Sequence, residues 1–349
     1  MNNKIITYVS LLLLQSCITS NYFSSPKIIK EIPKTEPTST KIEKVIDSKT
    51  MFHDQKNIIL SLSDGSEVNA EIFRPSVSLT PKTVVIIVPG SGNVSRFGEV
   101  NNDGLTTYET AVNQSELWAK ALANKGLFVL SYDKRSCQKE HNPQCNTTSQ
   151  KILNEQGIQV LANDVDSVCD MVESKLSNNP NTKIVLLSFA QGSQSIALSK
   201  CLNKASSVVL ISPIIKDLEN TWVNGLNNAS TQNAYMHKKN DLINQAESTK
   251  VFFASLKKGD FPASANIRGA SVIFWQSWIK AVSQTIDLIK KSGTPTMFLF
   301  AQNDPFFDKT QSPIGTKFFK DVDRNLLNSR GLSEEAVDSV VDFIKTLVL

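Results

Sequence analysis

Five short apolar segments constrain the fold of this chain more than any other feature. They are TVVIIVPG (83–90), LFVLSYD (127–133), KIVLLSF (183–189), SSVVLISP (206–213) and TPTMFLFAQNDP (294–305). Continuous apolar runs of this length are typical of strands that are covered on both faces. Segments with helical periodicity lie between them, including 115–126, with Ser115 as a possible N-cap and Gly126 as C-cap, and about 157–176. The alternation predicts an α/β fold with a doubly wound, mostly parallel sheet.

Two further segments complete this organisation. Residues 57–75 contain two alternating apolar runs around Asp64-Gly65, which predicts an opening antiparallel hairpin. Residues 213–292 interrupt the alternation with polar and aromatic residues. We expect them to form a mostly helical lid over the strand ends, with aromatic side chains that pack between lid and body rather than forming a ligand box.

The segment KIVLLSFAQGSQSIAL (183–198) predicts a strand, a sharp turn and a helix. Its five central positions, Ser188 to Gly192, correspond to the G-x-S-x-G pattern of a nucleophile elbow. In that pattern, small residues two positions before and after the nucleophile allow a strained turn to close. Both small residues are present here. The nucleophile position, however, holds Ala190, whose methyl group cannot attack a substrate.

In their order and spacing, five segments resemble the α/β-hydrolase fold, most closely the exported serine hydrolases and peptidase-like esterases. These segments are VVIIVPGSG, ALANKGLFVLSYDKRS, IVLLSFAQGSQSIAL, VVLISP and PTMFLFAQNDP. The resemblance covers about 57–212 and 293–349. It implies one α/β-hydrolase-like domain over 51–349 with the lid 213–292 inserted, and a catalytic serine, acid and histidine in that chain order.

The resemblance places the acid at Asp304, directly after the last apolar segment, although a turn aspartate that caps its own backbone is the alternative. The histidine is expected in FFKDVDRNLL (318–327), where Arg324 stands instead. Arginine stays protonated and cannot serve as a general base, but its guanidinium group is suited to a bidentate pair with Asp304. The three histidines of the chain, at 53, 141 and 237, all precede the last apolar segment.

A hydrolase fold without its nucleophile keeps the backbone N–H groups of the oxyanion hole, which we assign to Gln191 and to Ser91 or Gly92. With Arg324 and the N-terminus of the following helix, they predict an anion-accepting pocket under the lid, partly neutralised by Asp304. The leading prediction is therefore a catalytically inactive pseudohydrolase that acts as a binding or scaffold protein.

Two other functions remain open. One is an active esterase or peptidase with a relocated catalytic set, for which His237 is a candidate base. The other is a mainly structural component of the cell envelope. A serine-directed probe separates an active enzyme from a binding protein, and a thermal shift with small molecules separates a binding protein from a structural one.

The first residues predict export. Lys4, an apolar run over 5–14 and Gln15-Ser16-Cys17 fit the regions of a signal peptide, and the run is too short to span a bilayer. The segment LQSC resembles a bacterial lipobox, which implies cleavage after residue 16 and a lipid on Cys17. An ordinary signal peptide that contains a cysteine is the alternative. Lipid chains would anchor the protein in the bacterial cell envelope, at the outer membrane or periplasmic face, through a disordered tether over 17–50.

Four cysteines remain besides Cys17, and an even number in an exported protein favours two disulfides over metal ligands or redox chemistry. Four cysteines allow three pairings. We favour Cys137 with Cys145, inside one loop, and Cys169 with Cys201, on two helices that are neighbours in the predicted fold.

Charge and composition restrict the partners. The 349 residues carry 37 Lys and Arg interspersed with 33 Asp and Glu, so no basic stripe indicates a nucleic-acid partner. Because 40% of the residues are hydrophobic, the chain can bury a large core. We expect no cofactor and no metal. The expected partners are membrane lipid through Cys17 and either an envelope protein or a small anionic ligand.

Overall fold

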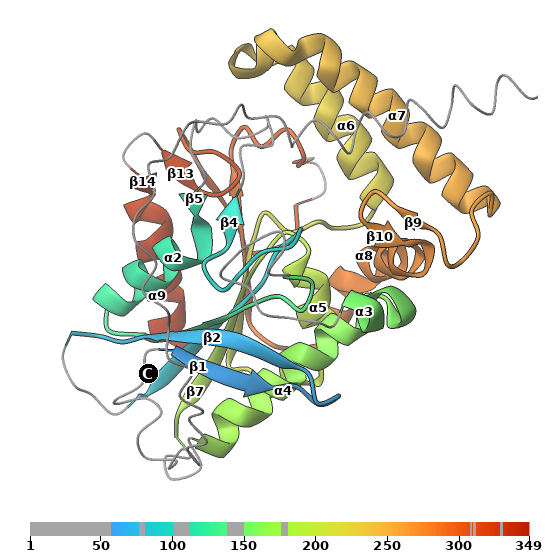
Figure 1. The fold of residues 1–349 in the computed structure, drawn as a ribbon. Coiled ribbons are helices and arrows are strands. Elements are labelled where there is room, and N and C mark those ends of the chain that lie inside the picture. Colours follow the sequence, from blue (N-terminus) through green and yellow to red (C-terminus); the bar gives the residue numbers. More distant parts are fainter. Residues whose placement is uncertain are drawn as a thin grey trace, which may run out of the picture.

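The central feature of the fold is a sheet of eight strands in the order β1-β2-β6-β3-β7-β8-β11-β12, shown for the computed structural model in Figure 1. The structure describes residues 57–76, 81–100, 112–137, 150–175, 181–307, 309, 312–328 and 331–348. The strands are β1 (Asn57–Ser61), β2 (Glu67–Phe73), β6 (Phe128–Tyr132), β3 (Thr83–Val88), β7 (Lys183–Phe189), β8 (Ser207–Ile211), β11 (Thr296–Ala301) and β12 (Thr316–Phe319). The five apolar segments therefore form five strands of one sheet.

The strand directions match the prediction of a mostly parallel sheet. The predicted hairpin is confirmed, since β1 pairs antiparallel with β2, and β2 pairs antiparallel with β6. The pairs from β6 across to β12 are parallel. Val88 of β3 lies opposite Ser188 of β7, and Phe189 lies opposite Ile211 of β8. The carboxyl ends of these three strands therefore meet at one edge of the sheet, where open α/β sheets bind ligands.

Helices cover both faces of the sheet. Along β3, Val84, Ile86 and Val88 belong to one buried cluster, and Val85 and Ile87 belong to another. The first cluster includes side chains of α4, α5 and the C-terminal part of α8, and the second includes α2 and α9. The bounds of the covering helices are α2 (Gln114–Asn124), α4 (Gln159–Lys175), α5 (Gly192–Leu198), α8 (Val272–Ser292) and α9 (Glu334–Val348). Because β3 is buried on both faces, its sequence is almost continuously apolar.

Several boundaries differ from the predicted ones. Helix α2 begins at Gln114 with Asn113 at the N-cap, so Ser115 lies in the first turn instead of capping the helix. Gly126 follows the C-cap Lys125 with φ of 93°, a left-handed conformation that glycine adopts at low cost. The helix predicted over 157–176 is α4, and a separate short helix, α3 (Gln150–Gln156), precedes it.

The region between β11 and the terminal helix is more ordered than predicted. Residues 316–319, the first part of which precedes the expected histidine loop, form the edge strand β12 parallel to β11. Three small two-residue pairings are also present: β4 (Glu99–Val100) with β5 (Val112–Asn113), β9 (Asn266–Ile267) with β10 (Ala270–Ser271), and β13 (Leu327–Asn328) with β14 (Gly331–Leu332). Arg324 therefore lies between β12 and β13, before α9.

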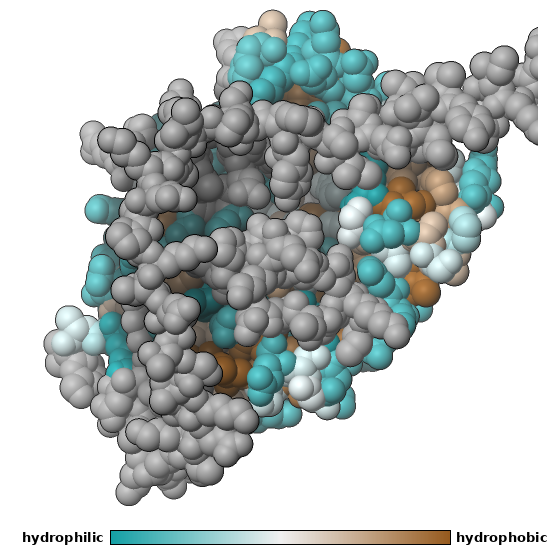
Figure 2. All heavy atoms as spheres, viewed as in Figure 1, coloured by the Kyte–Doolittle hydropathy of each residue, from teal (hydrophilic) through white to brown (hydrophobic). Residues whose placement is uncertain are grey.

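Between β8 and β11 the chain leaves the sheet and forms a helical insertion. Its main elements are α6 (Leu218–Thr231), the 3-10 helix η2 (Asn233–Lys238), α7 (Lys239–Lys258) and α8 (Val272–Ser292). Helices α6 and α7 form a hairpin that projects from the body (Figure 1), and its outer end is mostly hydrophilic (Figure 2). Among the described residues, no helix is both long enough and apolar enough to cross a membrane.

Aromatic side chains of this insertion pack against one another. Trp275 and Trp278 stack with ring centres 5.5 Å apart, and Trp222 meets both rings edge-on at 5.6 and 5.7 Å. Phe252 and Phe253 complete a buried cluster that also includes α4 residues. These contacts agree with the interpretation of the aromatic residues as packing between lid and body.

One predicted disulfide is present. Cys169 of α4 and Cys201 of the 3-10 helix η1 (Lys200–Asn203) are joined, with their Cα atoms 6.1 Å apart. Cys137 is also disulfide-bonded. Its expected partner Cys145, the signal peptide 1–16 and the tether 17–50 with Cys17 all lie outside the described residues.

Candidate functional site

The turn after β7 has the backbone geometry of an elbow. Ala190 has φ of 41°, in the left-handed region that side-chain-bearing residues rarely adopt. A Cβ added at Gly192 would lie 2.8 Å from the carbonyl oxygen of Pro89 and 2.9 Å from the Cβ of Ser188. The turn therefore requires a residue without a side chain at 192 and favours a small one at 188, as the sequence pattern predicts.

Hydrogen bonds fix this turn. The N–H of Ala190 donates to the carbonyl of Ile211 at 3.1 Å, and the hydroxyl of Ser193 donates to the carbonyl of Ala190 at 2.6 Å. Ser188, Ser193 and Ser195 are buried, and none of them lines the cavity above the elbow. None of these three serines therefore reaches the cavity, whereas Ser91, Ser115 and Ser212 line it.

A cavity of about 480 Å³ lies over the methyl group of Ala190. The loop after β3 forms one wall, and the insertion forms another through residues of α6 and α7. The lining side chains are mainly apolar near the elbow, and include Phe189, Ile211, Ile214, Trp222, Leu226 and Phe306. A cavity of this size and lining is typical of small-molecule sites.

The backbone groups assigned to an oxyanion hole lie at this cavity or beside it. Ser91 and Gly92 line the cavity, and Gln191 follows Ala190 directly. Among the described residues, none accepts a hydrogen bond from the backbone N–H of Ser91, Gly92 or Gln191. These donors are therefore available to an anion. The expected contribution of the following helix is reduced, because α5 has only seven residues.

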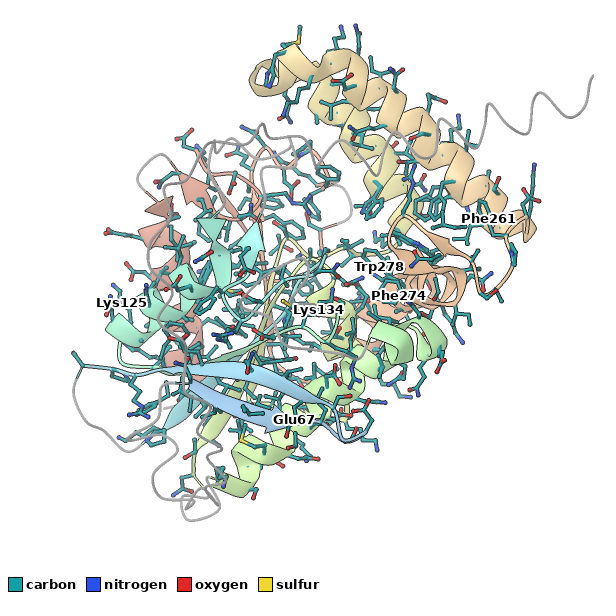
Figure 3. The ribbon with its side chains drawn as sticks, in the orientation of Figure 1. Glu67, Lys125, Lys134, Phe261, Phe274 and Trp278 are labelled. Carbon is teal, nitrogen blue, oxygen red and sulfur yellow. A yellow bond between two sulfur atoms is a disulfide. The ribbon has the colours of Figure 1, made fainter. Side chains whose placement is uncertain are left out.

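Lys134 ties these two backbone segments together. Its ammonium group donates to the carbonyls of Gly90 and Gly92 at 2.8 and 2.9 Å and to the side-chain oxygen of Gln191 at 2.6 Å. The side chain lies in the interior, whereas Lys125 lies at the periphery (Figure 3). Burial lowers the pKa of Lys134 from 10.5 to about 7, since no carboxylate among the described residues pairs with it.

Arg324 does not form the predicted pair with Asp304. Its guanidinium lies over the Phe306 ring, 4.6 Å from the ring centre, and its backbone carbonyl accepts a hydrogen bond from Ser212 at 2.5 Å. Asp304 is buried, and its Oδ1 accepts the N–H of Phe306 at 2.9 Å. The aspartate thus caps its own turn, the alternative that the sequence left open. Asp304 does not line the cavity, whereas Arg324 does.

Histidine is absent from the described walls of this cavity. His237 is exposed in η2, at the outer end of the α6–α7 hairpin, and the other two histidines lie outside the described residues. In the part of the chain that the structure describes, the charged side chains that line the cavity are Glu99, Arg268 and Arg324. Glu99 already accepts hydrogen bonds from Ser95, so positive charge dominates the lining. The arrangement suits an anion that bears an apolar group.

No family model matches the sequence, and no curated protein matches it significantly. Solved structures do match in fold. A proline iminopeptidase of Mycobacterium smegmatis is 13% identical with a TM-score of 0.53, over 84% of this chain and 98% of that chain. A highly thermostable carboxyl esterase from Bacillus coagulans is 12% identical with a TM-score of 0.51, over 84% and 98% of the two chains.

A third similar structure is Est1E from Butyrivibrio proteoclasticus with bound ferulic acid, which is 13% identical with a TM-score of 0.51, over 83% of this chain and 99% of that chain. These likenesses, together with the sheet order and the elbow, show that the chain has the α/β-hydrolase fold. The predicted fold class is confirmed.

Two parts of the site were not predicted from the sequence. The sequence did contain a signal for Lys134, because two basic residues, Lys134 and Arg135, directly follow the apolar segment 127–133, and such a pair is unusual after a buried strand. No sequence signal placed Arg268 at the site, since this residue lies in the short β9–β10 turn of the insertion, with φ of 52°. Its guanidinium donates to Thr249 at 3.0 Å and to Ser248 at 3.2 Å. These contacts join the β9–β10 turn to α7, and the hydrophobic periodicity of the sequence does not predict that the two segments meet.

Proposed function

We propose that this protein is a catalytically inactive pseudohydrolase that binds a small carboxylate in the cavity over Ala190. It acts in the bacterial cell envelope, attached through a lipid on Cys17. The observation that carries the proposal is the elbow itself: Ala190 keeps a left-handed backbone, with φ of 41°, at the wall of a cavity that Arg324 also lines. The chain thus keeps the backbone geometry of a nucleophile position, although the residue there has no nucleophilic atom.

The ligand class is supported by the walls of the cavity. The backbone N–H groups of Ser91 and Gly92 and the guanidinium of Arg324 are donors at these walls that suit a carboxylate, and the N–H of Gln191 lies next to the lining residue Ala190. Ile214, Trp222 and other apolar side chains line the remaining space and suit a hydrocarbon or aromatic group. A carboxylate that bears an apolar group satisfies both parts.

Calorimetric titration with hexanoate, and with hexanol as an uncharged match, tests this proposal. Hexanoate should bind and hexanol should bind at least about tenfold more weakly, because a hydrogen bond to a charged group contributes about 1.5–3 kcal/mol. Arg324→Met should weaken hexanoate binding by a similar factor. Lys125→Met is the matched control, since Lys125 pairs with Asp338 at the surface. Equal affinity for the two probes would contradict the proposal.

A further inference from the structure

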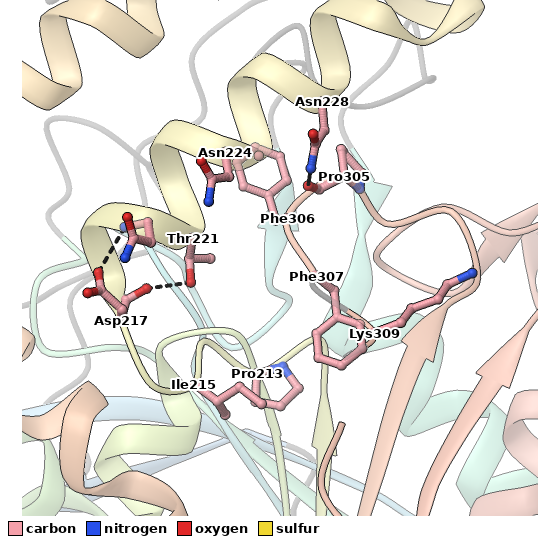
Figure 4. Close-up of a pocket in the computed structure, with 12 residues that line it drawn as sticks. Pro213, Ile215, Asp217, Thr221, Asn224, Asn228, Pro305, Phe306, Phe307 and Lys309 are labelled. Atoms are coloured by element: carbon pink, nitrogen blue, oxygen red, sulfur yellow. Dashed lines mark hydrogen bonds between the residues drawn. The ribbon is translucent and has the colours of Figure 1, made fainter. Parts of the chain in front are cut away.

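A second cavity of about 500 Å³ lies between α6 and the segment that follows β11 (Figure 4). It is separate from the cavity over Ala190, because among the described residues Phe306 alone lines both. Its volume lies within the range of ligand-binding cavities, about 300–1,000 Å³. The proposed carboxylate function does not use it.

One wall of this second cavity is a row of side-chain amides. Asn220, Asn224 and Asn228 follow one another at four-residue intervals on α6, about 6 Å apart along the helix axis, and so share one face. The amide nitrogen of Asn228 donates to the carbonyl of Pro305 at 3.1 Å. Within the described part of the chain, the amides of Asn220 and Asn224 make no side-chain hydrogen bond. Two amides therefore remain available to a ligand.

A second wall, which meets α6 at Gly225 and Asn228, is apolar and held in place. Phe307 stacks on Phe300 with ring centres 3.5 Å apart. Phe306 packs against α6 at Gly225, where an added Cβ would overlap the ring. Pro213 and Pro305 extend this wall (Figure 4). A ligand in the cavity therefore faces amides on one side and fixed aromatic and proline surfaces on the other.

The charge of this cavity favours no ion of either sign. Asp217 and Lys309 are the charged residues that line it in the described part of the chain, and their charges are opposite. Each asparagine amide supplies both a donor and an acceptor, which is the complement of a hydroxyl group. A ligand that combines a rim of hydroxyls with an apolar C–H face is a sugar ring. We propose that this cavity binds a neutral saccharide between the asparagine row of α6 and Phe306 and Phe307.

Saccharide binding is testable with the full mature chain. Maltotriose, cellotriose and tri-N-acetylchitotriose are titrated separately by calorimetry, and at least one should bind with a Kd of about 1 mM or tighter. Asn224→Ala should weaken that binding about three- to tenfold, because it removes hydrogen bonds to a neutral ligand. Asn227→Ala is the matched control, since Asn227 is exposed on the same helix and lines neither cavity.

Two outcomes would overturn the assignment. One is the absence of binding by all three saccharides at about ten times that concentration. The other is binding that Asn224→Ala leaves unchanged or that Asn227→Ala weakens equally. Tetraglycine serves as a peptide probe, and its capture in an Asn224-dependent manner without saccharide binding would assign the cavity to peptides instead. Hexanoate affinity is measured on the same two variants and should not change, because neither residue lines the cavity over Ala190. The saccharide test and the carboxylate test can therefore fail independently.

Discussion

The guanidinium of Arg324 lies 4.6 Å from the centre of the Phe306 ring, at the wall between the two cavities. The backbone N–H of Phe306 is bonded to the carboxylate of Asp304 at 2.9 Å. The cation and the carboxylate therefore contact the same residue without pairing with each other. A Ser-His-acid triad needs its base and acid in direct contact, which the positions of Arg324 and Asp304 do not provide.

Ala190→Ser alone is expected to give no measurable turnover of a short-chain p-nitrophenyl ester. The new hydroxyl would lack a general base, and such a base contributes about 10²–10⁴ in rate. The double variant Ala190→Ser with Arg324→His should be the smallest change that gives turnover, and the rate should be low because Asp304 is bonded to its own turn. Steady-state assays of both variants measure this. Turnover by the single variant would mean that another residue acts as base.

Lys134 makes stability depend on pH. Burial lowers its pKa in the folded protein to about 7 from an unfolded value of 10.5. Below pH 7 both states hold the proton, and between pH 7 and 10.5 only the unfolded chain does. Lys134 thus contributes a rise in the free energy of unfolding with increasing pH across this window. Urea unfolding at several pH values should show a smaller rise in Lys134→Met than in the wild type.

Two comparisons make this pH test specific. Lys280→Met, at an exposed position of α8, should follow the wild-type dependence. Lys134→Met should also weaken hexanoate binding, since it leaves the carbonyls of Gly90 and Gly92 without their shared donor. An identical pH dependence in wild type and Lys134→Met would contradict the lowered pKa.

The disulfide between Cys169 and Cys201 should contribute strongly to stability. It closes a loop with a sequence separation of 32 residues between α4 and η1, for which chain entropy gives about 3–4 kcal/mol. Replacing both cysteines with alanine should lower the free energy of unfolding by about that amount in chemical denaturation. A loss under about 1 kcal/mol would contradict this contribution of the cross-link.

Lipid attachment at Cys17 is tested by fractionation. If the cysteine is acylated, Cys17→Ser should move the protein from the membrane fraction to the soluble one, since lipid chains supply the anchoring free energy. Mass spectrometry of the wild-type N-terminus should show the added lipid. Retention of an exported Cys17→Ser protein in the membrane fraction would count against the lipobox interpretation.

Most of the sheet was predictable because its strands are buried on both faces. Such strands read as continuous apolar runs, as in 83–88 and 183–189, and the elbow has a local pattern of small residues. The edge strand β12 was missed because two of its four residues are exposed, so its sequence lacks that signal. Local patterns thus identified the centre of the sheet and the hairpin at one edge, but not the strand β12 at the other edge.

The site was predicted only where it depends on local sequence. Ala190 follows from the elbow pattern, and Arg324 from its place before the terminal helix. The stacking of Arg324 on Phe306 instead of pairing with Asp304 depends on how two separate loops pack, as does the contact of Lys134 with Gly90. Neither contact has a signature along the chain, because its partners are 18 and 44 residues apart.

The proposed catalytic inactivity of the protein is tested most directly by labelling the intact wild-type protein with a fluorophosphonate and measuring its mass. Such a probe forms a covalent bond with an activated serine, wherever that serine lies in the chain. Our account predicts no adduct on the wild type after prolonged incubation, with a known serine hydrolase labelled in parallel. A stoichiometric adduct on any serine of the wild-type protein would contradict it and would indicate an active enzyme with a relocated catalytic set.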